Sequence, residues 1–252
     1  MSALTLVALG VFGLLGGVGI SAIGPGGVLP TIGLAMLTTL SPAQIAGTAL
    51  VTHVATGGAG SAAYLRSGEL RRPQVRRTAQ LLCATAVFGT PIGILVNSWL
   101  SPRAFSVALA VLMAGVAALV LLRERGRTNR ATGHHPPQAV VAGIGGAVAV
   151  VAGVVGIGGP MLTVPLLVVA GVDMLEALAA AQAQSVIIAG VGSIGYAMQG
   201  SVDWKVAALV GIPELIGVFV GWRIARALPV RMLRFGLVAA MLAVAPYLAL
   251  HG

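Results

Sequence analysis

The sequence carries very little charge. Only 8% of its 252 residues are charged and only six are acidic, whereas 58% are hydrophobic and the mean hydropathy is +1.00. A soluble domain covers its surface with roughly a quarter charged residues, so this composition excludes an ordinary soluble protein. Crossing the hydrocarbon core takes roughly 20 apolar residues per helix, so the length allows about eight to ten membrane segments. The chain is therefore predicted to be a polytopic α-helical membrane protein.

Several signatures of catalysis and metal binding are also missing. The single cysteine, Cys83, excludes a disulfide framework and a cysteine metal site. There is no phosphate-binding P-loop, no Gly-x-Ser-x-Gly elbow and no zincin spacing of histidines. We therefore expect no enzyme activity, no cofactor, no bound metal and no transport driven by nucleotide hydrolysis.

The basic residues that give the formal net charge of +9 are concentrated beside apolar segments. Thirteen of the fifteen Lys and Arg residues lie in the stretches 66–77, 123–130 and 223–234. Cytoplasmic loops of membrane proteins show this enrichment, so the charge does not indicate nucleic-acid binding. No Lys or Arg precedes Arg66, so we expect the first apolar stretch to be retained as a membrane helix and not cleaved as a signal peptide.

Glycine, proline and charge divide the chain into ten apolar segments. We expect helices near 3–22, 25–40, 43–66, 74–99, 103–122, 138–157, 159–172, 174–198, 204–226 and 229–250. The second and seventh are too short for a straight crossing, and each follows a Gly/Pro cluster, so both are predicted to be half-helices. The polar stretch 123–137 is predicted to be a cytoplasmic linker between a first transmembrane repeat, 1–122, and a second, 138–252.

The two halves share a sequence repeat. The stretch 58–68 matches 190–200 at an offset of 132, with five of eleven positions identical, including Tyr64 and Tyr196. The basic loop after the first copy corresponds to a nearly uncharged loop after the second, whereas the next pair of loops shows the reverse bias. If the basic loops face the cytoplasm, the halves are inverted and both termini lie outside. The predicted fold is all-α, with two inverted-topology repeats of about five helical segments each.

Broken helices in inverted repeats are typical of transporter binding sites near the membrane midplane. The N-terminus of a half-helix offers unpaired N–H groups and a favourable dipole to an anion, and glycine lets the ligand approach the backbone. The alternative is that these glycines only allow close helix crossing. The candidate backbone positions are Gly24, Pro25, Gly26, Gly27, Gly156, Gly158 and Gly159.

The helix after each half-helix supplies neutral polar side chains. Hydroxyls and amides there are suited to binding an oxyanion without a fixed cation, although in membrane helices such groups often bond only their own backbone. The candidates for substrate binding are Thr48 and Thr52 in the first half and Gln182, Gln184 and Ser185 in the second.

Two ionisable side chains are expected to lie deep in the membrane. His53 changes charge in the physiological pH range and is a candidate proton carrier, with a satisfied interhelical histidine as the alternative. Glu214 is a second candidate, since intramembrane acids are costly and usually functional. Pairing of Glu214 with Arg223, or capping at the Pro213 break, is the alternative there.

The paired glycine-rich stretches 24–30 and 156–165, the repeated Tyr64 to Gly68 and Tyr196 to Gly200, the basic linker and the length together resemble the sulfite exporter TauE/SafE family. The likeness extends over nearly the whole chain, but Pro25 interrupts the usual Gly-Gly-Gly form in the first half. The resemblance implies a permease in the cytoplasmic membrane of a prokaryote, exporting sulfite, sulfoacetate or related anions with ion coupling.

We therefore expect a secondary exporter of a small anion that works by alternating access, as one half rocks against the other. Its partners would be the lipid bilayer, the anion and a coupling proton or sodium ion, with no nucleic acid. An anion channel of the same architecture is the first alternative, and an intramembrane enzyme is the second.

Overall fold

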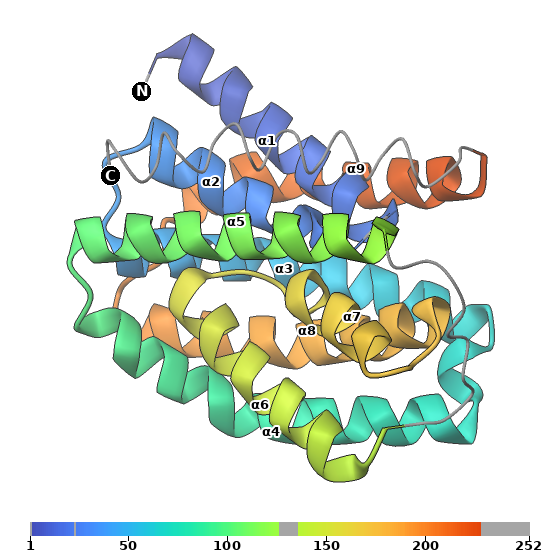
Figure 1. Cartoon of the computed structure of the whole chain (residues 1–252). Helices are drawn as coiled ribbons and strands as arrows, with labels where there is room; N and C mark the ends of the chain where they lie inside the picture. The colour runs from blue at the N-terminus through green and yellow to red at the C-terminus, as the bar shows by residue number, and fades with distance from the viewer. Residues whose placement is uncertain (1, 23, 126–135, 228–252) are drawn as a thin grey trace.

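The computed structural model describes residues 2–22, 24–125 and 136–227, and within these ranges all regular secondary structure is helical (Figure 1). The helices are α1 (Ala3–Ala22), η1 (Pro25–Gly27), α2 (Val28–Leu37), α3 (Pro42–Arg66), η2 (Glu69–Arg71), α4 (Pro73–Ser98), α5 (Pro102–Arg125), α6 (Gln138–Val155), α7 (Pro160–Val169), α8 (Met174–Met198) and α9 (Trp204–Ala227). Helix α5 runs to Arg125, past the expected start of the linker at residue 123. The expected segment 229–250 lies outside the described residues.

Helix starts follow local chemistry. Ser41 caps α3 through a capping box with Gln44, and the Asp173 side chain accepts a hydrogen bond from the Leu175 backbone N–H at the start of α8. Proline occupies the first turn of α3, α4 and α7, where its missing N–H costs nothing. These signals explain why the observed bounds lie within a few residues of the expected ones.

Five helices in the described part of the chain are long and apolar enough to cross a membrane: α1, α4, α6, α8 and α9. Helices α2 and α7 contain ten residues each, too few for a crossing, which confirms their expected shortness. Each is preceded by an interruption of the chain path at a glycine-rich stretch. The protein is therefore a multi-pass membrane protein with two short interior helices.

The packing joins helices from the first half of the sequence with helices from the second half (Figure 1). Helix α1 lies along α9, α4 lies along α6, and α3 lies along α8 between these two outer pairs. Helix α3 also contacts α9, and α4 contacts α8. Each outer pair thus combines one helix from the first half of the sequence with one from the second.

Glycines make these close pairings possible. A Cβ on Gly17 of α1 would collide with the carbonyl oxygen of Glu214 on α9, and a Cβ on Gly93 of α4 would collide with that of Val150 on α6. Backbones that approach this closely gain van der Waals contacts, the main attraction between helices in lipid. The α1–α9 contact positions Glu214, and the α4–α6 contact supports the second glycine-rich stretch.

Candidate functional site

The two glycine-rich breaks meet inside the molecule. A Cβ on Gly24, before η1, would lie 3.4 Å from the carbonyl oxygen of Pro160 at the start of α7. The Thr31 hydroxyl on α2 donates a hydrogen bond of 2.9 Å to the carbonyl of Gly156 at the end of α6. Each break therefore contacts the short helix that follows the other.

Backbone conformation explains why glycine occupies the turning points. Gly24 has φ of 99° and Gly156 has φ of 76°, values that L side chains rarely adopt. Gly156 ends α6 in the left-handed conformation, and a Cβ there would collide with the backbone of Ala46 on α3. Only glycine satisfies both the turn and the close approach.

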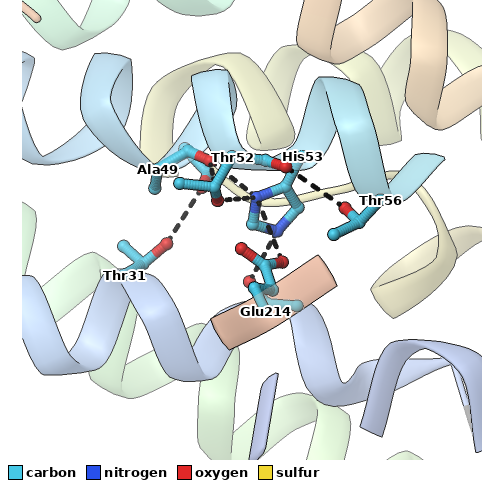
Figure 2. Close-up of polar contacts among 8 residues, drawn as sticks. Thr31, Ala49, Thr52, His53, Thr56 and Glu214 are labelled. Carbon is cyan, nitrogen blue, oxygen red and sulfur yellow. Dashed lines mark hydrogen bonds and ion pairs between the residues drawn. The ribbon is translucent and has the colours of Figure 1, made fainter. Parts of the chain in front are cut away.

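His53 lies where the breaks meet α3. Its side chain is 1% exposed, with Nδ1 2.6 Å from the Ala49 carbonyl oxygen and Nε2 2.9 Å from the Gly27 carbonyl oxygen. Figure 2 shows the ring between the α3 backbone on one side and Glu214 on the other. The ring thus connects α3 to the first break.

Glu214 approaches His53 from α9. It is fully buried, and its Oε1 lies 3.8 Å from Nδ1 of His53. Neither carboxylate oxygen has a hydrogen-bond partner among the described residues. Arg223, the alternative partner considered from the sequence, is exposed on the same helix, and α9 continues through Pro213 without a break. The structure therefore places the two candidate proton carriers side by side.

The second break contributes Gly158, which lies beside Ser185 of α8. A Cβ on Gly158 would lie 2.8 Å from Cδ2 of His53 and 3.0 Å from Oγ of Ser185, whose side chain is buried. A Cβ on Gly159 would lie 3.2 Å from Oε1 of Gln184. The interior site thus contains both breaks, His53, Glu214 and Ser185.

Thr48 and Thr52 of α3 are buried, and the hydroxyl of each already forms a hydrogen bond within the protein. The Thr52 hydroxyl donates to the Ala49 carbonyl at 2.8 Å and also lies 3.2 Å from Nδ1 of His53. The Thr48 hydroxyl accepts a 3.0 Å hydrogen bond from the Asp203 backbone N–H, ahead of α9. Thr52 therefore belongs to the surroundings of His53, whereas Thr48 joins α3 to the start of α9.

The two glutamines of α8 have different environments. Gln184 accepts a 2.6 Å hydrogen bond from the Thr163 hydroxyl and donates one of 3.1 Å to the Gly145 carbonyl, which links α6, α7 and α8. Gln182 faces Gly60 of α3, and its buried Oε1 has no hydrogen-bond partner in the described part of the chain. Gln184 holds the short helix in place, and Gln182 lies further along the α3–α8 contact.

The sequence-based prediction of the site did not include two residues, although the repeat pointed to them. Thr31 and Thr163 are the only hydroxyl-bearing residues of α2 and α7, and both tie their short helix to a neighbour. Their numbers differ by 132, the same offset as the repeat. Extending the repeat upstream by that offset identifies them as a matched pair.

The family model described as sulfite exporter TauE/SafE matches residues 9–248. The chain belongs to the sulfite exporter TauE/SafE family. This is a family of membrane transporters, so the family member described here is a transport protein with several membrane-crossing helices. Neither the curated proteins nor the solved structures provide a significant match. Within the described residues, no group of three His, Cys, Asp or Glu side chains is placed to hold a metal ion.

Proposed function

We propose that this protein is a secondary transporter that exports a small anion across the cell membrane of a prokaryote. Sulfite is the leading substrate, with sulfoacetate and related sulfur-containing or organic anions in the same class. Family membership supports the class of reaction. The observation that carries the site assignment is the meeting of both glycine-rich breaks beside buried His53 and Ser185.

The breaks provide the chemistry that an oxyanion needs. The first N–H groups of α2 and α7 have no partner within their own helices, and the helix dipoles favour negative charge there. Gly27, Gly158 and Gly159 bring the backbone against His53, Ser185 and Gln184, whereas Gly26 allows the close crossing of α1 at Gly19. In this proposal Ser185 and Thr52 contribute hydroxyls near the anion, and Gln184 keeps α7 in position.

Alternating access follows from an inverted repeat, which is part of the proposal. The repeat is supported by the equivalent pairings of α1 with α9 and α6 with α4, and by the matched Thr31 and Thr163. Because each outer pair contains a helix from each half, the moving bodies would be the α1–α9 pair and the α4–α6 pair. Their relative rocking about α3 and α8 would open the site to one side and then the other.

The test is flux of radiolabelled sulfite from proteoliposomes holding the purified protein, with sulfoacetate, thiosulfate and sulfate as competitors. We expect saturable efflux, competition by at least one of these anions, and a rate that responds to an imposed pH gradient. Ser185→Ala is expected to weaken apparent affinity, whereas Glu176→Gln, beside Arg72 in the first turn of α8, serves as the control. Flux that never saturates and ignores the pH gradient would indicate a channel. Absence of flux when each of the four anions is radiolabelled in turn would contradict this substrate class.

A further inference from the structure

Each ring nitrogen of His53 lies against a carbonyl oxygen, which only accepts hydrogen bonds, and the Thr52 hydroxyl, 3.2 Å from Nδ1, donates to the same Ala49 carbonyl. The carbonyl oxygen of Ala49 lies 2.6 Å from Nδ1, and that of Gly27 lies 2.9 Å from Nε2. A neutral imidazole carries one N–H, so one of these contacts would place a nitrogen lone pair against an oxygen lone pair. Both contacts are favourable only when both nitrogens carry a proton.

One carboxyl group is available to balance this charge. Helices α1, α2 and α7 and the η1 turn, which surround the breaks, contain no titratable side chain. On α8, Glu176 lies in the first turn beside Arg72, and the Tyr196 hydroxyl donates to the Gly153 carbonyl. On α9, Lys205 is exposed in the first turn and Arg223 is exposed near the other end. Of the described titratable groups on these elements, only Glu214 faces His53, at 3.8 Å.

The Glu214 carboxylate is poorly fixed for a buried group. It is fully buried, and neither oxygen accepts a hydrogen bond from the described residues. The distance of 3.8 Å from Nδ1 is beyond hydrogen-bonding range, so the two groups attract without a directional bond. A carboxylate in this position is readily neutralised by a proton when another negative charge arrives, since two buried anions strongly disfavour each other.

We propose that His53 is an imidazolium ion in this conformation, that Glu214 is its internal counter-anion, and that the transported anion replaces Glu214 in this role. This inference rests on the proposed function, since it assumes that an anion binds at the breaks. The anion enters beside Gly158 and Ser185, against the Cδ2 edge of the ring, as the helix pairs move apart, because in this conformation even a Cβ on Gly158 would lie 2.8 Å from Cδ2 of His53. One proton from the aqueous side forms an O–H bond on the Glu214 carboxylate, and His53 keeps both of its protons.

The exchange couples one proton to each anion. Because the bound state holds one more proton than the empty state, anion affinity rises as the pH falls, by up to about tenfold per pH unit. A monovalent anion is then carried without net charge, and a divalent anion carries one net negative charge. The proton and the anion leave together on the opposite side, so a pH gradient drives the anion.

The first experiment determines the charge of His53 without any substrate. His134, His135 and His251 are replaced by Gln, and the full chain is labelled with isotopic nitrogen in histidine and reconstituted in lipid near neutral pH. We expect nitrogen NMR to show a ring with two protonated nitrogens, and this signal to disappear in Glu214→Gln but to persist in Glu176→Gln. A neutral ring in the unmodified site would overturn the inference, whatever the transport result.

The second experiment measures coupling. Thiosulfate, or sulfoacetate if only that anion competes with sulfite, is used as the probe because neither titrates in the range where histidine does. With the membrane potential clamped, we expect Glu214→Gln to retain anion–anion exchange but to lose accumulation driven by a pH gradient. Its apparent affinity should become independent of pH.

The outcomes separate the two proposals. Gradient-driven accumulation in Glu214→Gln equal to that of the unmodified protein would overturn the counter-anion role while leaving anion transport intact. Absence of anion flux in the unmodified protein would remove the proposed function, and the role of Glu214 as an exchangeable counter-anion would be overturned with it. Should Glu214→Gln fail to fold, Glu214→Asp, which keeps the charge on a shorter side chain, is expected to retain gradient-driven accumulation, and its loss would count against the inference.

Discussion

At the scale of single residues, the lack of a side chain at Gly158 allows His53 and Ser185 to lie close together. It separates the His53 ring from the Ser185 hydroxyl, and a methyl group in its place would lie 2.8 Å and 3.0 Å from them. Interior positions packed this tightly do not accept an added carbon without displacement of a neighbour. The neighbours here are the groups proposed to surround the anion.

We therefore expect Gly158→Ala to lower anion flux by about tenfold or more, because misplacing binding groups by about 1 Å has effects of that size. The matched control is Gly190→Ala on α8, where an added Cβ meets nothing within 4 Å. That variant should transport normally and gain about 0.5 to 1 kcal/mol of helix stability. Flux and thermal stability of the purified proteins would be measured together. Equal flux in Gly158→Ala and the unmodified protein would contradict the placement of the site.

At the scale of elements, side-chain hydrogen bonds to neighbouring helices fix the positions of the short helices α2 and α7. Helix α7 has ten residues, and its Thr163 is fixed by Gln184, which also bonds the Gly145 carbonyl of α6. Helix α2 is held comparably by Thr31 and the Gly156 carbonyl. A half-helix gains little from propensity alone, so its position depends on such contacts.

We expect Gln184→Leu to destabilise the protein by about 1 to 3 kcal/mol, because the Thr163 hydroxyl and the Gly145 carbonyl lose their buried partner. Thr163→Val should cost less, and the double variant should cost less than the sum of the two, since both act on one interaction. Unfolding in detergent, followed by fluorescence, would give these values. Strict additivity would show that the two side chains do not act together.

At the scale of the whole molecule, the direction of α4 and α8 agrees with the distribution of basic residues: both helices begin at the end where the basic stretch around Arg72 lies. Arg72, just before α4, lies 3.4 Å from Glu176 in the first turn of α8, so both helices begin at the same end. They continue in parallel, because Gly192 lies near Thr90 and Gly195 near Ile94. The segments that follow α4 and α8 therefore emerge at the opposite end from the basic stretch around Arg72.

This arrangement predicts that Arg103 and Lys205 face outside the cell. Each is replaced by cysteine in a Cys83→Ser background and treated with a thiol reagent that does not cross membranes. Both should be labelled on intact cells, whereas Arg72→Cys should react only after the membrane is opened, as the bias of basic residues toward the cytoplasm requires. Labelling of Arg103→Cys or Lys205→Cys only after opening would contradict the inverted orientation of the halves.

The sequence by itself determined the membrane class, the helix ends and the positions of the two breaks. These depend on local properties, namely the length of apolar runs, the φ angles open to glycine and the missing N–H of proline. It also indicated His53 and Glu214 as the buried ionisable groups. Only the tertiary structure decided that these two face each other, that Gln184 and Thr48 are engaged by Thr163 and Asp203, and that α1 pairs with α9. The partner of a buried polar group depends on which helix backbones approach closely, and that follows from packing along the whole length of each helix.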